Sequence, residues 1–209
     1  MSQIEPVVET YGWQNPSEAC AHDYIKPTIL RILRQLAPRK ILDLGCGNGA
    51  LTHALRKAGY QAMGCDADSE GIAFAQTGGG DFKVVSVYED PIQLGDSGFD
   101  CVVSAEVIEH LFTPGALPRF AHKVLAPNGH LVITTPYHGY AKNLILSLLN
   151  KWDTHIDPMW DGGHIKLWSR TTLTRLLEKN GFTVIEFHGV GRFPYLWKSM
   201  ILVARRIDT

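Results

Sequence analysis

Residues 41–49 read Ile41-Leu42-Asp43-Leu44-Gly45-Cys46-Gly47-Asn48-Gly49, and this stretch decides the fold class. An apolar strand runs into a glycine turn, and a helical pattern that includes Leu51 and Leu55 follows at once. The three glycines let the chain bend sharply and bring bare backbone against a ligand. Strand, glycine turn and helix together begin a nucleotide-binding α/β unit.

Apolar strands alternate with helical segments along most of the chain. Strands are expected at about 40–44, 61–65, 82–86, 99–104 and 130–135, and helices at about 49–58, 68–76 and 114–125. This alternation predicts an α/β fold with a Rossmann-like, doubly wound and mostly parallel sheet. Two further strands, Phe182–His188 and Ser199–Arg205, have no helix between them and are expected to pair antiparallel. The predicted sheet therefore has seven strands and ends in an antiparallel hairpin.

The composition is typical of one ordinary globular domain. The 209 residues are 45% hydrophobic and 20% charged, and the formal net charge is −1. This charge predicts no general attraction to nucleic acid or anionic lipid. The four cysteines show no disulfide or metal-ligand spacing, which favours reduced thiols. With no secretory signal pattern and no apolar run of the ~20 residues that cross a bilayer, a cytoplasmic protein is expected.

Asp43 bears on which nucleotide the glycine turn binds. It lies inside the strand, two residues before Gly45, where a pyrophosphate binder gains nothing from a negative charge. S-adenosylmethionine (SAM) carries a sulfonium and an ammonium group and no phosphate, so it benefits from this carboxylate. Gly45, Gly47 and Ala50 also fit the relaxed dinucleotide pattern, which leaves an NAD-dependent enzyme as an alternative.

The stretch Leu42-Asp43-Leu44-Gly45-Cys46-Gly47-x-Gly49 resembles the first motif of the class I SAM-dependent methyltransferases. Later motifs of that family recur in the right order, so the resemblance covers nearly all of the chain. Helical patterns from Ser17 and from Pro27 predict two N-terminal cap helices within residues 1–38. The SAM-binding methyltransferase domain is expected over residues 39–209, with an acceptor-side insertion at 136–168, and the whole forms a single structural domain.

The cofactor-binding residues are expected at the carboxyl ends of the strands, where ligands of open α/β sheets bind. Asp66 ends the second strand about twenty residues after the turn, as an acceptor for the ribose hydroxyls should. Asp43 would lie behind the ammonium group. The other candidates are Gly45, Cys46 and Gly47 at the methionine part, Ala67, Val87 and Tyr88 at the adenine, and Ala105, after Ser104, at the reactive methyl.

The segment Glu106-Val107-Ile108-Glu109-His110 places three polar side chains directly after the fourth strand. If the segment is helical, residues i, i+3 and i+4 share one face and form a plausible divalent-metal site. The quinone-biosynthesis O-methyltransferases resemble it here, and so do the small-RNA 2′-O-methyltransferases, whose motif binds a metal beside the target hydroxyl. By this resemblance Glu106, Glu109, His110 and His164 would hold Mg²⁺ or Zn²⁺.

An interpretation without a metal is also open at this segment. One carboxylate, such as Glu109, would then cap a helix or pair with a cation, and His110 or His164 would act as the general base. Histidine has the right ordinary pKa to take the proton of an alcohol or a phenol. Both readings make Glu109, His110 and His164 the catalytic candidates.

The acceptor side is expected in the insertion at 136–168, which is long and rich in aromatic residues. Tyr137 and Trp160 within it, and Trp13 and Tyr24 from the N-terminal part, are the candidates to surround the substrate. The apolar stretch 144–149 is expected to pack as a helix on the domain core. Its alternative is contact with a lipophilic substrate or a membrane surface, as the quinone-enzyme resemblance implies.

The leading prediction is a SAM-dependent methyltransferase that O-methylates a hydroxyl of a small aromatic or lipophilic molecule. A metal-dependent RNA terminal 2′-O-methyltransferase is the first alternative, although clustered Lys and Arg for backbone binding are lacking. The second alternative is a non-catalytic SAM-binding regulatory subunit. The identity of the acceptor depends on loop arrangement, which the order of residues does not give.

Overall fold

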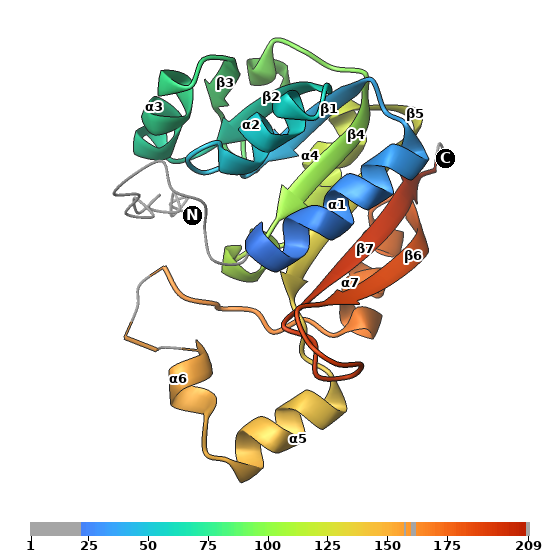
Figure 1. Ribbon diagram of the computed structural model, residues 1–209. Coiled ribbons are helices and arrows are strands. Elements are labelled where there is room, and N and C mark those ends of the chain that lie inside the picture. Colours follow the sequence, from blue (N-terminus) through green and yellow to red (C-terminus); the bar gives the residue numbers. More distant parts are fainter. Residues whose placement is uncertain (1–21, 157, 160–161, 208–209) are drawn as a thin grey trace, which may run out of the picture.

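The structure is a computed structural model that describes residues 22–156, 158–159 and 162–207 (Figure 1). Its sheet has seven strands in the order β3-β2-β1-β4-β5-β7-β6. The strands are β1 Lys40–Leu44, β2 Gln61–Asp66, β3 Asp81–Val84, β4 Phe99–Ala105, β5 Leu125–Pro136, β6 Phe182–Val190 and β7 Ser199–Arg206. Strand β7 pairs antiparallel with both β5 and β6, and the other pairs are parallel. The predicted fold class, including the terminal hairpin, is confirmed.

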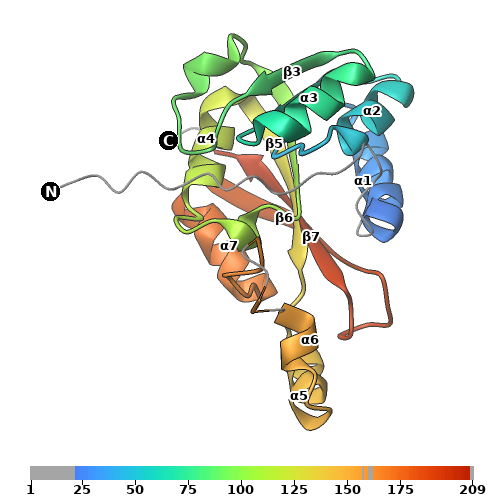
Figure 2. The ribbon, with the colours of Figure 1, turned by 90° about the vertical axis from the view of Figure 1, so that its left-hand side faces the viewer.

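Helices cover both faces of the sheet. They are α1 His22–Leu36, α2 Ala50–Lys57, α3 Ser69–Thr77, α4 Ala116–Val124, α5 Tyr140–Leu148, α6 Trp152–Ile156 and α7 Arg170–Lys179, with the short 3₁₀ turns η1 Pro91–Leu94 and η2 Ile108–His110. Helices α1 and α2 lie on one side, and α4 and α7 lie on the other (Figure 2). Each side encloses its own core of fully buried aliphatic side chains, as a doubly wound sheet requires.

The prediction that Pro27 opens a second helix is wrong. Helix α1 runs from His22 to Leu36 with Pro27 inside its second turn. A proline there removes one backbone hydrogen bond of the helix. Fully buried side chains at helical spacing on both sides of the proline, Ile25, Ile29, Ile32 and Leu33, form one continuous stripe against the sheet, and this packing keeps the helix intact.

The expectation that residues 144–149 pack on the domain core is also wrong. Helices α5 and α6, here called the α5–α6 extension (residues 140–156), project from the carboxyl end of β5 away from the sheet (Figures 1 and 2). Leu144, Leu148 and Leu149 are exposed, and the only buried side chain of α5 is Lys142.

Helix α7 is capped at its N-terminus by Ser169, which forms a capping box with Thr172. Cys46, Cys65 and Cys101 are buried thiols. Among the described residues, no helix combines the length and the apolar character needed to span a membrane.

Candidate functional site

The glycine turn after β1 contacts β2 on one side and the segment after β4 on another. Gly45 and Gly47 have positive φ values of 82° and 51°, a region that glycine reaches without strain. The amides of Gly45 and Cys46 donate to the carbonyl of Cys65 at 2.8 and 3.0 Å. A Cβ on Gly45 would lie 2.5 Å from Cγ2 of Val107, so the turn also touches the segment that follows β4.

Asp66 fixes the shape of the turn. Its Oδ2 accepts a hydrogen bond from the amide of Gly47 at 2.7 Å, and its Oδ1 accepts one from the amide of Asp68 at 2.9 Å. A carboxylate oxygen has two lone pairs, so both oxygens keep one for the hydroxyls of a ribose. The predicted role of Asp66 toward the ribose therefore stays a prediction, and the structure adds a second role in holding the turn.

Asp43 is buried beneath the turn. It is 1% exposed, and the hydroxyl of Thr52 on α2 donates to its Oδ2 at 2.6 Å. Burial raises the pKa of Asp43 to about 7, and the Thr52 hydrogen bond opposes this only in part. A cation nearby would favour the charged form, which agrees with the predicted place of Asp43 behind the SAM ammonium group.

Asp43→Asn is expected to raise the melting temperature of the SAM-free protein, and more at pH 8 than at pH 5. The folded-state pKa of Asp43 lies above its ordinary value, so the stability of the unsubstituted protein falls as the pH rises toward 7. The upper bound on this loss is about 4 kcal/mol. Asparagine keeps an acceptor for Thr52. An equal gain at both pH values, measured by calorimetry, would contradict the assigned pKa.

The other cofactor candidates differ in exposure, and their contacts with SAM stay predictions. The side chain of Cys46 packs beneath the turn in a buried cluster with Phe82. Tyr88 is 39% exposed, and its hydroxyl accepts a hydrogen bond from the amide of Thr113 at 3.4 Å. Val87, Ala67 and Ala105 are half-buried at their strand ends. Ser104, expected beside Ala105 at the methyl, is instead buried and donates to the carbonyl of Leu44.

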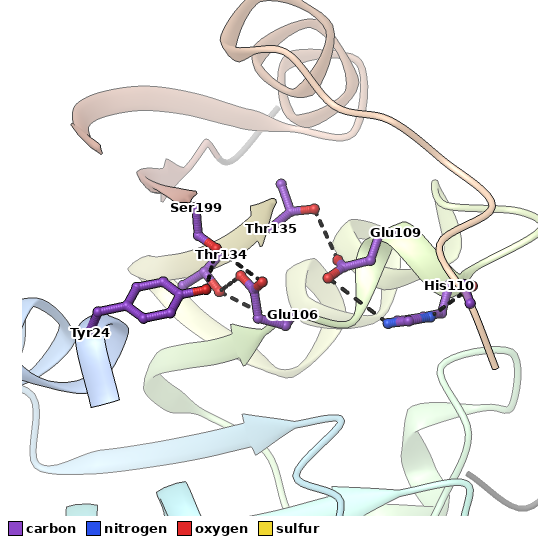
Figure 3. Close-up of polar contacts among 8 residues, drawn as sticks. Tyr24, Glu106, Glu109, His110, Thr134, Thr135 and Ser199 are labelled. Atoms are coloured by element: carbon purple, nitrogen blue, oxygen red, sulfur yellow. Dashed lines mark hydrogen bonds and ion pairs between the residues drawn. The ribbon is translucent and has the colours of Figure 1, made fainter. Parts of the chain in front are cut away.

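Glu106 does not share a helical face with Glu109, contrary to the expectation from their spacing. Its φ of 56° is left-handed, and the 3₁₀ turn η2 begins only at Ile108. Its carboxylate accepts hydrogen bonds from the hydroxyls of Thr134 at 2.7 Å and Ser199 at 3.1 Å (Figure 3). Burial raises the pKa of Glu106 to about 7. A non-glycine residue in this backbone region stores strain, as often seen at functional sites.

Glu109 is fully buried, and its Oε1 lies 4.0 Å from Nε2 of His110 but has no hydrogen-bond partner among the described residues (Figure 3). The hydroxyl of Thr135 donates to its Oε2 at 2.9 Å. Thr134 and Thr135 are neighbours on β5, so their side chains point to opposite faces of the sheet. Each threonine binds one glutamate (Figure 3). The two carboxylates are therefore held on opposite sides of β5.

Three of the four predicted metal ligands come together. Ligand atoms of Glu109, His110 and His164 all lie within 4.8 Å of one another, and Glu106 is not part of this group. The amides of Ile165 and Lys166 both donate to the carbonyl of Glu109 at 3.0 Å, which holds the loop of His164 against η2. We call these three residues the Glu109–His110–His164 cluster.

Burial controls the protonation of this cluster. It lowers the pKa of His110, and it lowers that of His164 to about 4, with a smaller effect from His110. Burial, followed by the charge of Glu106, raises the pKa of Glu109 well above its usual range. Nδ1 of His110 donates to the carbonyl of Gly163 at 3.1 Å. Both imidazoles are therefore neutral at pH 7, the form that binds a metal or accepts a proton.

Of the four substrate-side candidates, the structure describes two. The hydroxyl of Tyr24 lies 3.3 Å from Oγ of Ser199 and so adjoins the Glu106 carboxylate (Figure 3). Tyr137 is buried, with its ring 5.1 Å from that of Trp197, and belongs to the core on the α7 side. Trp13 and Trp160 lie outside the described residues.

Sequence reasoning missed the hydroxyl groups that hold the carboxylates in place. They belong to Thr52, Thr134, Thr135 and Ser199, which bind Asp43, Glu106 and Glu109. Each occupies an unremarkable position in a helix or a strand pattern. The pairing of β4 with β5 and of β5 with β7 brings the hydroxyls of β5 and β7 to Glu106 and Glu109, whereas the hydroxyl of Thr52 reaches Asp43 from α2.

The doubly wound sheet with its antiparallel hairpin, and the glycine turn above a buried aspartate, define a class I SAM-dependent methyltransferase. A methyltransferase domain family model matches residues 18–187, so the chain belongs to this family. Its cofactor is SAM, and proteins named for ubiquinone biosynthesis are among its relatives.

Two of these relatives show the extent of the similarity. The ubiquinone biosynthesis O-methyltransferase of Hydrogenovibrio crunogenus is 25% identical over 192 residues, which are 88% of this chain and 80% of the relative. The mitochondrial enzyme of the same name from Homo sapiens is 32% identical over 174 residues, 78% of this chain. The chain spans only 46% of the length of the human relative.

Solved structures show the same fold. Magnesium protoporphyrin IX methyltransferase from Synechocystis, solved with bound S-adenosylhomocysteine (SAH), has a TM-score of 0.65 at 18% identity, over 86% of this chain and 81% of that one. A SAM-dependent methyltransferase from Methanosarcina mazei has a TM-score of 0.66 at 21% identity, over 85% and 98% of the two chains. The comparisons support neither the RNA methyltransferase nor the non-catalytic subunit, and the family assignment excludes the NAD-dependent alternative.

Proposed function

We propose that the protein transfers the methyl group of SAM to a hydroxyl oxygen of a small aromatic or lipophilic molecule. The observation that carries this proposal is the Glu109–His110–His164 cluster, which begins two residues after Val107, the residue in contact with the glycine turn. A proton-accepting group thus lies at the carboxyl end of β4, where the methyl of SAM is expected. The relatives named for ubiquinone O-methylation support an oxygen acceptor.

The reaction requires the protein to position the methyl acceptor beside SAM and to remove one proton from the acceptor hydroxyl. The acceptor oxygen attacks the methyl carbon, the C–S bond breaks, and its electron pair stays on the sulfur of SAH. In-line positioning supplies much of the rate acceleration. The hydroxyl proton passes to a neutral imidazole, either His110 or His164, both of which burial keeps unprotonated at pH 7.

The same cluster suits a divalent cation. Two neutral imidazoles and one carboxylate form a ligand set for borderline metals, and the buried Oε1 of Glu109 has no hydrogen-bond partner. Glu109, His110 and His164 would hold the ion; Glu106 would not, because both of its oxygens are bound by hydroxyls. A bound Mg²⁺ or Zn²⁺ would lower the pKa of the acceptor hydroxyl.

The test is a methyl-transfer assay with SAM and a panel of phenols and catechols, each paired with its fully O-methylated ether. Formation of SAH is expected with the free hydroxyl compounds and not with the ethers. Mass spectrometry then identifies the methylated atom. SAH formation only with amines or carbon acids, or with no acceptor in a panel that also includes prenylated phenols, would overturn the assignment.

We also propose that the α5–α6 extension contacts a membrane surface from which a lipophilic acceptor is taken. Tyr140 and Leu148 are 85% and 75% exposed, and Leu144 and Leu149 are exposed on the same projecting helix. Exposed apolar side chains on a short helix, with Lys151 following it, are typical of interfacial binding.

Leu148→Asp is expected to lower binding to vesicles of anionic phospholipid about tenfold. The leucine side chain would be buried in the membrane interface on binding, and the substitution replaces it with a charged carboxylate. Co-sedimentation measures the bound fraction. Ile92→Asp is the matched control, because Ile92 is 81% exposed but lies on η1, far from the extension in the sequence and in the fold. Equal binding of both variants and of the parent chain would contradict the proposal.

A further inference from the structure

Two buried imidazole nitrogens at the base of the α5–α6 extension have no hydrogen-bond partner among the residues that the structure describes. They are Nε2 of His138 and Nε2 of His155. His138 is 6% exposed and follows β5 directly, whereas His155 comes from α6. Their rings lie 5.3 Å apart, so α6 returns to the end of β5 and brings the two unpartnered atoms to one place.

The structure fixes which nitrogen of His138 carries the proton. Its Nδ1 lies 3.2 Å from Oδ1 of Asn143, an oxygen that can only accept, so Nδ1 is the donor. Burial, followed by the charge of Lys142, lowers the pKa of His138 to about 4. The imidazole is therefore neutral, and its Nε2 presents a buried lone pair that accepts hydrogen bonds.

A buried lone pair without a donor is destabilising, so a ligand that satisfies both nitrogens gains from binding here. A cation or a hydrogen-bond donor could do so. Lys142 favours a hydrogen-bond donor over a cation as the ligand. It is 8% exposed, and its Nζ donates to the carbonyl of Lys198 at 3.3 Å. Its positive charge lowers the pKa of both His138 and His155. A second cation would be repelled, whereas the oxygen of a hydroxyl would be attracted.

We propose that His138 and His155 form a hydroxyl-binding subsite, in which Nε2 of His138, and Nε2 of His155 in its Nδ1–H tautomer, accept hydrogen bonds from the O–H groups of a ligand and Lys142 favours negative charge on its oxygen. Trp152 forms a wall of this subsite, with its ring stacked at 10° and 6.3 Å from that of His138. Neither histidine belongs to the Glu109–His110–His164 cluster.

The subsite adjoins that cluster, because β4 and β5 are parallel neighbours whose carboxyl ends lie at one edge of the sheet, and the amide of His138 donates to the carbonyl of Trp168, in the segment that follows His164. An acceptor held in the cluster could therefore place a second polar group on His138 and His155. A site built to bind a hydroxyl rejects analogues that lack it far more strongly than an apolar wall selects by size. This deepens the proposed function and rests on it, because it makes His138 and His155 specificity-determining residues for the methyl acceptor.

The test uses the full chain with SAH bound, labelled with ¹⁵N at histidine, and phenol as the probe with anisole as its non-donating match. Phenol is expected to move the Nε2 resonances of His138 and His155 saturably upfield, and anisole is expected to leave them in place. His53, whose Nε2 contacts the carbonyl of Ala75, serves as the control in the same spectra. His138→Phe, which keeps a ring at this position, is expected to weaken phenol binding at least tenfold with unchanged SAH affinity.

Equal shifts with phenol and anisole would overturn the subsite. So would Nε2 resonances that are already hydrogen-bonded in the SAH complex and do not respond to phenol, since the pair would then hold water only. Because the spectra report binding and the SAH-release assay reports transfer, the two proposals fail separately. Shifts without methyl transfer to any hydroxyl would leave the subsite in place and remove O-methylation, and the reverse result would remove the subsite alone.

Discussion

Replacing Asp66 by asparagine is expected to lower the affinity of the chain for SAM and SAH about 10- to 100-fold. The carboxylate accepts hydrogen bonds from the amides of Gly47 and Asp68, and an asparagine has only one accepting oxygen for these two donors. Hydrogen bonds to a charged group contribute about 1.5–3 kcal/mol each. The substitution therefore loosens the turn and removes one acceptor for the ribose. Isothermal titration with SAH measures the change.

Asp68→Ala is the matched control from the same loop. Asp68 accepts hydrogen bonds from the amides of Glu70 and Gly71 and so begins α3, without binding the glycine turn through its carboxylate. Loss of this cap is expected to lower the free energy of unfolding by about 1 kcal/mol and to leave SAH affinity within about threefold. If both variants lost affinity equally, Asp66 would have no specific role at the cofactor.

Glu109→Gln is expected to weaken Mn²⁺ binding at least about 30-fold and to lower the rate of methyl transfer about 10²- to 10³-fold. The amide can still accept from Thr135, so local packing is preserved, but it cannot supply the negative charge that an ionised Glu109 would bring to the ion. Removal of a charged ligand to a divalent ion costs several kcal/mol. The paramagnetic relaxation of water protons reports Mn²⁺ affinity independently of turnover.

Glu106→Gln separates this arrangement from the four-ligand set that the sequence motif implies. Glu106 is the same residue type three positions earlier, but both of its oxygens are bound by Thr134 and Ser199. Its substitution is expected to change Mn²⁺ affinity by less than about threefold. Glu106 lies outside the ligand group, so its replacement by an uncharged amide removes only a screened Coulomb attraction to the ion. Equal weakening by Glu106→Gln and Glu109→Gln would show that both carboxylates bind the ion.

The fold was predictable because its signals are local. The glycine turn at 45–49, the period-two and period-3.6 patterns around it, and the short link between the last two strands each follow from a few neighbouring residues. Pro27 and residues 144–149 were misread for one reason. In both places the outcome depends on packing against segments distant in the sequence. Helix α1 has this packing and stays intact through the proline, whereas α5 lacks it and projects from the domain.

The candidate site was predictable in its members and not in its arrangement. The motif at 106–110 and His164 were identified as polar residues beside the cofactor turn, and three of these residues do meet. That Glu106 turns to the other side depends on its left-handed backbone and on Thr134, and a spacing rule for helices contains neither fact. The pairing of His138 with His155 depends on α6 returning to the end of β5.

The sequence alone determined that this chain forms a mostly parallel sheet with a glycine turn for SAM. It could do so because the turn and the strand periodicity each depend on residues that are close together in the sequence. Tertiary structure alone decided which of the two glutamates lies with His110 and His164. Successive residues of β5 point to opposite faces of the sheet. Thr134 and Thr135 therefore bind Glu106 and Glu109 on opposite faces, although the helical spacing of the motif predicts that the two glutamates share one face. Side-chain partners from strands far apart in the sequence carry that information.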